Sequence, residues 1–125
     1  MLKLYRFSDS KKEYWETWEE TPRSHLVHWG DLGTEGNTKT VTSSLFRNAE
    51  KTLKKEIDEL IRQSFAPVLP DDHAILMVEY SIDNMGSEAD VDKRHRLEDF
   101  LNEKLGWTGL GACDGGSMDN GTMEV

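Results

Sequence analysis

The hydrophobic period of the chain changes near Ser43–Leu45, and no other feature constrains the fold as strongly. Before this point, short runs in which apolar and polar residues alternate are separated by turns rich in Gly, Pro, Ser and Asp. Such alternation is typical of β-strands, whose successive side chains point to opposite faces of a sheet. We therefore expect four strands joined as an antiparallel meander. The four runs are Leu2–Phe7, Glu13–Glu19, His25–Gly30 and Thr38–Thr42.

After this point, apolar residues recur every three or four positions, which is the spacing of one face of an α-helix. We expect a helix over about residues 44–65, with Ser44 as its N-cap. A helix stripe and one sheet face can bury each other, so we predict an α+β fold in which one long helix covers an antiparallel four-stranded sheet. The stripe consists of Phe46, Ala49, Leu53, Ile57, Leu60 and Ile61.

A domain boundary is predicted at residues 66–72, which hold two of the three prolines. Proline stops a helix and pushes the preceding residue toward extended geometry. The charge changes at the same place: residues 1–66 carry eleven basic and eleven acidic side chains, whereas residues 67–125 carry four and thirteen. We predict a neutral domain at 1–66, a linker at 67–72 and an acidic unit at 73–125.

The acidic unit has the pattern of a small β-α-β unit. The continuous apolar run Ala74–Tyr80 predicts a central strand buried on both faces, and Val91, Leu97, Leu101 and Leu105 mark a helix over about residues 88–105. A glycine-rich tail ends in a predicted strand, Thr122–Val125. So small a unit leaves a sheet face and edges uncovered. We expect it to dock on the first domain, to belong to a longer chain, or to pair with a second copy, and of these we favour a homodimer.

Composition narrows the class of protein further. The formal net charge is −9, and one cysteine, Cys113, excludes an internal disulfide and a multi-cysteine zinc site. The first residues lack the apolar run of a signal peptide. No apolar stretch approaches the ~20 residues that cross a bilayer. We expect an acidic cytoplasmic protein without a membrane partner.

Residues 28–40 carry a resemblance to a known family. The sequence His28-Trp29-Gly30-Asp31-Leu32-Gly33-Thr34-Glu35-Gly36-Asn37-Thr38-Lys39-Thr40 lies between Trp15-Glu16 and the predicted helix. This order is similar to that of WGR domains, which are named for a Trp-Gly-Arg tripeptide, and the resemblance covers about residues 3–66. WGR domains occur in poly(ADP-ribose) polymerases that respond to DNA damage and in many bacterial proteins.

The resemblance implies a nucleic-acid-binding surface. In the polymerases, the motif Trp stacks on a sugar near a DNA end, and basic side chains hold phosphate or a neighbouring domain. By position, Trp29 and Gly30 match the motif, Lys39 takes the basic position after the turn, and Arg23 is a further basic candidate. Asp31 replaces the motif Arg. A carboxylate there repels phosphate and removes a bidentate contact, which weakens the inference that the chain binds DNA.

Other residues have simpler structural interpretations. We expect Trp15 and Trp18 to pack in the core or to cover a sheet face, whereas for Trp29 packing and stacking both stay open. His25 and His28 are three apart on a strand, so they point to opposite faces and cannot hold one metal together. Acidic residues at 83–92 lack the spacing of a calcium loop, so we interpret Ser87 and Asp90 as helix caps.

The chain contains no phosphate-binding, zinc-hydrolase or nucleophile-elbow motif. We therefore predict no enzyme activity, no catalytic residue, no metal site and no cofactor. Two functions stay open. The first is a WGR-type recognition module associated with nucleic acid. The second is an acidic module that binds a basic protein, with an interface that includes Met77, Glu79, Met123 and Val125.

Overall fold

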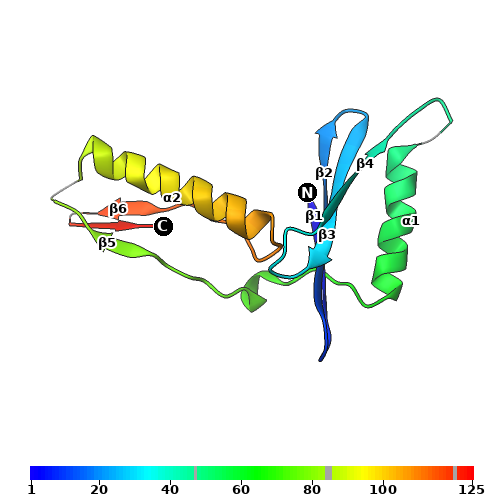
Figure 1. Cartoon of the computed structure of the whole chain (residues 1–125), viewed down its shortest axis with the longest axis horizontal. Helices are drawn as coiled ribbons and strands as arrows, with labels where there is room; N and C mark the ends of the chain where they lie inside the picture. The colour runs from blue at the N-terminus through cyan, green and yellow to red at the C-terminus, as the bar shows by residue number, and fades with distance from the viewer. Residues whose placement is uncertain (47, 84–85, 120) are drawn as a thin grey trace. The chain divides into compact units, whose positions relative to one another are not determined.

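A computed structural model describes residues 1–46, 48–83, 86–119 and 121–125 of the chain (Figure 1). Its internal contacts divide the chain into two compact units, Met1–His73 and Ala74–Val125. We call them the N-terminal unit and the C-terminal unit and describe each by itself.

The N-terminal unit contains the predicted antiparallel four-stranded sheet, in the order β1-β2-β3-β4. Each strand pairs with the one before it in the chain, as expected when alternating runs are joined by short turns. The turn between the first two strands closes with a 2.8 Å hydrogen bond from the Ser8 amide to the Lys11 carbonyl. The strands are β1 (Leu2–Phe7), β2 (Lys12–Thr21), β3 (Ser24–Asp31) and β4 (Asn37–Thr42).

Helix α1 (Ala49–Arg62) follows the sheet and begins later than predicted. Asn48, and not Ser44, is the N-cap, because its side chain accepts a hydrogen bond from the Lys51 amide. The predicted first turn of the helix is absent from the described residues there: Leu45 and Phe46 are fully exposed, with 98% and 100% of their surface accessible. Phe46 therefore belongs to the loop and not to the apolar stripe.

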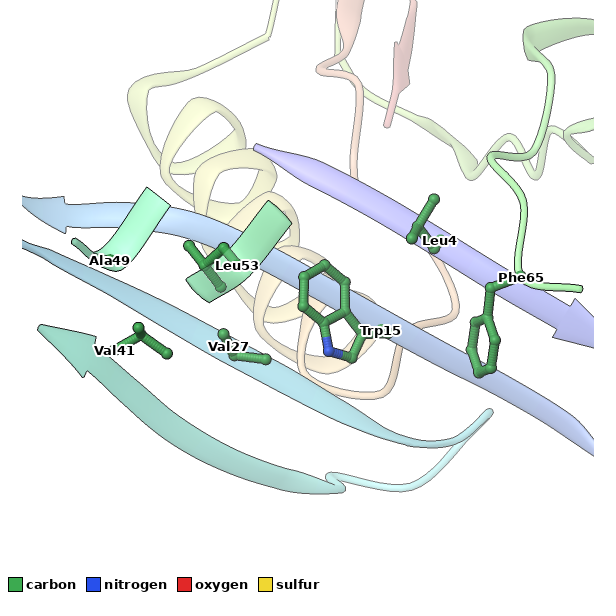
Figure 2. Packing of buried hydrophobic residues seen from close by; sticks show 7 residues of the cluster. All are labelled: Leu4, Trp15, Val27, Val41, Ala49, Leu53 and Phe65. Atoms are coloured by element: carbon green, nitrogen blue, oxygen red, sulfur yellow. The ribbon is translucent and has the colours of Figure 1, made fainter. Parts of the chain in front are cut away.

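The core of the N-terminal unit lies between one face of the sheet and α1 (Figure 2). Trp15 of β2 is at its centre, as expected, and Leu53 comes from the helix. After α1 the chain returns to the open edge of β1, where Tyr5 and Ala66 exchange two backbone hydrogen bonds of 2.8 and 2.9 Å. This return places Phe65 over the core. The buried cluster consists of Leu4, Trp15, Val27, Val41, Ala49, Leu53 and Phe65.

A short 3₁₀ turn, η1 (Pro70–Asp72), precedes the C-terminal unit. This unit contains helix α2 (Glu88–Gly106) and a three-stranded antiparallel sheet in the order β5-β7-β6. It is roughly compatible with the predicted β-α-β unit, with an additional strand inserted before the last one. The strands are β5 (Glu79–Ser81), β6 (Ser117–Asp119) and β7 (Thr122–Glu124).

The expectation of a buried strand at Ala74–Tyr80 was wrong. The strand begins only at Glu79, and Ile75, Leu76 and Met77 are 90%, 84% and 60% exposed. The physical reason is pairing: the described backbone hydrogen bonds between β5 and the last strand begin at Val78, which pairs with Val125. No described strand lies beside residues 74–77, and the apolar side chains of Ile75, Leu76 and Met77 are exposed.

Candidate functional site

Trp29 and Lys39, two of the residues that the family resemblance singles out, lie together on the face of the sheet that α1 covers. Trp29 is half-buried, and the Lys39 ammonium group stands 5.4 Å from the centre of its indole ring. The same ammonium group contacts both carboxylate oxygens of Glu56 on α1 at 2.8 Å. Glu56 also accepts a 3.1 Å hydrogen bond from the Trp15 indole nitrogen. Lys39 is thus already engaged by an aromatic ring and a carboxylate of its own unit.

Gly30 has a packing role in the loop between β3 and β4. A Cβ atom at Gly30 would lie 2.7 Å from the Cα atom of Gly36, so the two backbones can approach only because both residues are glycine. Gly36 has φ of +60° and packs against the Trp29 carbonyl and the Tyr14 hydroxyl. The glycines of the motif therefore fold the loop down onto β2, which explains them without any ligand.

Asp31, which stands in the place of the motif Arg, is exposed at the end of β3. Its carboxylate lies 3.6 Å from the Lys11 ammonium group, and its carbonyl accepts hydrogen bonds from the amide and hydroxyl of Thr34. Lys11 in turn pairs with Glu13, which also binds Arg6. Burial raises the pKa of Glu13, but the hydrogen bonds from Lys11 and Arg6 outweigh it and hold that pKa below its ordinary value. The positive charges near Asp31 are therefore neutralised locally.

Arg23 lies far from the other three nucleic-acid-binding candidates. It is exposed in the turn that precedes β3, whereas Trp29 and Gly30 lie at the far end of that strand. At about 3.4 Å per residue, six residues of strand separate Arg23 from Trp29 by about 20 Å. Arg23 contributes its carbonyl to the Ser43 amide at 2.8 Å. The structure thus joins Trp29, Gly30 and Lys39 at one end of the sheet and leaves Arg23 at the other.

The opposite face of the sheet carries a buried polar network that the sequence analysis missed. His28 is fully buried; its Nδ1 lies 2.7 Å from a Glu16 carboxylate oxygen, and its Nε2 lies 2.7 Å from the Glu35 carbonyl. Glu16 also pairs with Lys3 at 3.0 Å. Tyr14 lies 2.9 Å from His28 Nε2 and donates a 2.9 Å hydrogen bond to the Thr34 carbonyl. The network therefore ties the glycine loop to β1, β2 and β3.

The electrostatics of this network follow from its burial. Burial raises the pKa of Tyr14 to about 12, and the nearby carboxylates of Glu16 and Glu35 act in the same direction. Because His28 is closed off from solvent, these groups cannot reach a substrate, and their arrangement serves to hold the loop. The sequence alone does not show this network, because Glu16 and His28 become direct partners only through the β2–β3 register.

The protein-interface candidates lie on β5, just before it and at the end of the sequence. Met77 is 60% exposed and Glu79 is exposed, whereas Val125 is half-buried and joins Val78 through two 2.9 Å backbone hydrogen bonds. The backbone of Met123 pairs with Tyr80, but its side chain lies outside the described part of the structure. Met77 and Glu79 thus follow one another along an open edge of the C-terminal sheet.

Ser87 and Asp90 cap the beginning of α2, as predicted. Ser87 and Asp90 form a reciprocal capping box, in which Asp90 accepts a 2.7 Å hydrogen bond from the Ser87 amide. The backbone and side chain of Ser87 lower the pKa of Asp90. Among the described residues, no group of three or more His, Cys, Asp or Glu side chains could hold a metal ion. The described helices include none long and apolar enough to cross a membrane.

Comparisons with known proteins add no assignment to these surfaces. No family model, curated protein or solved structure matches the chain.

Proposed function

We propose that the chain is a non-catalytic recognition module with a WGR-like N-terminal unit, and that its C-terminal unit binds a basic protein. One observation carries the second part. No described residue of the C-terminal unit belongs to the buried hydrophobic core, whereas Ile75, Leu76 and Met77 are exposed in succession. A unit that leaves consecutive large apolar side chains in solvent has the property of a surface that a partner covers.

The charge of this unit favours a basic partner. Residues 74–125 carry eleven acidic and four basic side chains, a net charge of −7. Apolar anchors inside a charged surround are the usual composition of a protein interface, where the rim charges set the choice of partner and the rate of association. A partner rich in Lys and Arg would be attracted to this surface, and an acidic one would be repelled.

The positive charges of the N-terminal unit support nucleic-acid binding less well. Phosphate contacts supply most of the affinity for DNA, and they need cations that are free to approach the backbone. Six basic side chains of this unit already form ion pairs, and Asp31 adds a negative charge beside the motif Trp. The paired residues are Lys3, Arg6, Lys11, Lys39, Lys54 and Arg62. A nucleic-acid-associated role is therefore the second candidate, carried by the half-buried Trp29.

We propose no reaction, because the side chains whose pKa departs from its ordinary value are used within the fold. Several described side chains have a displaced pKa, and each is occupied by its own fold: Glu13 and Lys11 pair with each other, Asp90 caps α2, and Tyr14 is buried. Catalytic acids and bases instead combine a displaced pKa with access to a substrate. The described arrangement therefore supports recognition better than catalysis.

Affinity capture with the full chain tests the proposal. We expect the captured protein to be basic, to persist after nuclease treatment, and to bind the chain directly once purified. Ile75→Asp should abolish capture although it adds negative charge, which separates apolar contact from simple charge attraction. Phe100→Asp is the matched control, because Phe100 is an exposed apolar side chain of the same unit. Capture that nuclease abolishes, or that Ile75→Asp strengthens, would contradict the proposal.

A further inference from the structure

The outer edge of β5 is an unpaired strand edge. In the order β5-β7-β6, only one side of β5 faces another strand. Val78 and Val125 exchange both backbone hydrogen bonds, and the Ile82 amide binds the Gly121 carbonyl at 3.0 Å. Because backbone groups alternate in direction along a strand, those of Val78, Tyr80 and Ile82 face β7. The amides and carbonyls of Met77, Glu79 and Ser81 therefore face outward, with no other described strand beside them.

The side chains alternate in the same way. Tyr80 points to the α2 side of the sheet, since the Lys93 ammonium group lies 4.3 Å from the centre of its ring. Met77, Glu79 and Ser81 consequently occupy the other face, and all three are exposed. The edge thus offers outward backbone groups, an apolar side chain at Met77 and a carboxylate at Glu79, with the exposed Ile75 two residues earlier.

We propose that this edge binds an extended segment of the partner as an added strand, and that the segment carries a basic residue and an apolar residue two positions apart, on the same face. The inference rests on the function proposed above and specifies its binding mode. Main-chain hydrogen bonds to an open edge supply affinity, and alternate side chains supply specificity. A Lys or Arg opposite Glu79 completes a cross-strand ion pair, and an apolar side chain opposite Met77 covers its exposed surface.

A second copy of the chain fits the same edge poorly. Antiparallel pairing of two β5 edges about their centre places Glu79 directly opposite the Glu79 of the second copy, and like charges in that position are destabilising. Each C-terminal unit also brings a net charge of −7 to the contact. A basic segment removes both costs, so it is the occupant that the charges favour over the homodimer.

Calorimetric titration of the full chain with a short synthetic peptide, in which a lysine and a valine stand two positions apart with threonine at the positions between and beside them, tests this mode. We expect this peptide to bind, and the same peptide with glutamate in place of lysine not to bind. Hydrogen exchange should slow at the amides of Met77, Glu79 and Ser81 when the lysine peptide is present. Equal binding of both peptides, or exchange at these amides that the peptide leaves unchanged, would overturn the proposal.

Two substitutions separate the backbone from the side chains. Met77→Pro removes an outward amide, a change that an edge strand tolerates, and should weaken lysine-peptide binding about tenfold or more, the loss expected for one hydrogen bond plus a steric block. Met77→Ala keeps the amide and should weaken binding less. Glu79→Lys should reverse the preference between the two peptides. Unchanged exchange protection at Val78 and Val125 would show that the unit itself stays folded.

The outcomes also distinguish this inference from the proposed function. If the natural partner is still captured by Met77→Pro and Glu79→Lys, the edge is not the binding site and only the present inference fails. If sedimentation of the full chain without peptide shows a dimer that Glu79→Lys alters, a second copy occupies the edge and the inference is likewise overturned. If no basic protein is captured at all, the proposed function is wrong, and the inference that rests on it falls as well.

Discussion

Gly30 and Gly36 show how single residues position the loop that bears the family resemblance. The loop passes so close to β2 and β3 that a side chain at either position would meet backbone atoms. Below it, Tyr14, Glu16 and His28 are buried and joined by hydrogen bonds. The tripeptide Trp29-Gly30-Asp31 thus takes its geometry from a glycine contact on one side and a buried polar network on the other.

We expect Gly36→Ala to destabilise the N-terminal unit by about 3 kcal/mol or more. The alanine would adopt a left-handed φ, which costs about 1–2 kcal/mol, and its Cβ would collide with the Trp29 carbonyl and the Tyr14 hydroxyl. Gly33→Ala is the control: its φ of +90° carries similar strain, but nothing lies within 4 Å of the new Cβ. Urea unfolding followed by tryptophan fluorescence compares them, and equal losses would contradict the packing argument.

Tyr14 predicts a loss of stability at alkaline pH. Its pKa is about 12 in the folded chain against an ordinary value of 10.0, so the folded state holds the phenol proton more tightly. The resulting stabilisation, about 3 kcal/mol, is fully present below pH about 10 and disappears as the pH rises to about 12. The free energy of unfolding, measured across this range, should fall less steeply in Tyr14→Phe. Identical slopes in both proteins would show that Tyr14 is not the responsible group.

At the scale of elements, the four strands and two helices could be predicted because each carries a long or strongly periodic pattern. Where partners decide, the predictions failed. Phe46 continues the helical spacing, yet the helix begins at Ala49, where the Asn48 side chain caps it. The run from Ala74 is apolar enough for a buried strand, but no described strand pairs with the residues before Val78. Burial of a segment depends on what lies across from it, which local sequence does not state.

The candidate site divides in the same way. The family resemblance singled out Trp29, Gly30 and Lys39. These three residues lie near one another because they are close in sequence, on the two strands of one hairpin. The resemblance could not show that Glu56, seventeen residues beyond Lys39, holds its ammonium group. The buried pair of Glu16 and His28 required the register of β2 and β3, and that register shifts between Glu19 and Thr21 near the turn. Counting residues from the turn cannot predict a register that contains such an irregularity.

A pair of leucines tests the corrected start of α1. Leu53→Ala should cost about 2–5 kcal/mol, because Leu53 is 5% exposed and packs in the core of the N-terminal unit. Leu45→Ala should change stability by less than about 0.5 kcal/mol, because this side chain is 98% exposed. Thermal unfolding of both variants gives the comparison. A large loss for Leu45→Ala would place this side chain in the core and contradict the start of α1 at Ala49.

At the scale of the whole molecule, the two units differ in how they use their side chains. The N-terminal unit has a buried apolar cluster, although Leu45 and Phe46 are exposed, and it pairs many of its charges within itself. The C-terminal unit holds most of the excess negative charge and exposes a run of apolar residues. This contrast supports our central proposal, that the chain recognises a basic protein with its C-terminal unit and that the surface around Trp29 is a weak nucleic-acid site.

Fluorescence anisotropy of a labelled DNA duplex, titrated with the full chain at low and at physiological salt, tests this claim most directly. We predict binding that is weak at low salt and lost at physiological salt. Asp31→Arg should strengthen it by restoring a cation beside Trp29, and Glu56→Gln should add a further gain by releasing Lys39. Submicromolar binding of the unmodified chain at physiological salt, abolished by Trp29→Ala, would contradict the account and place the function on nucleic acid.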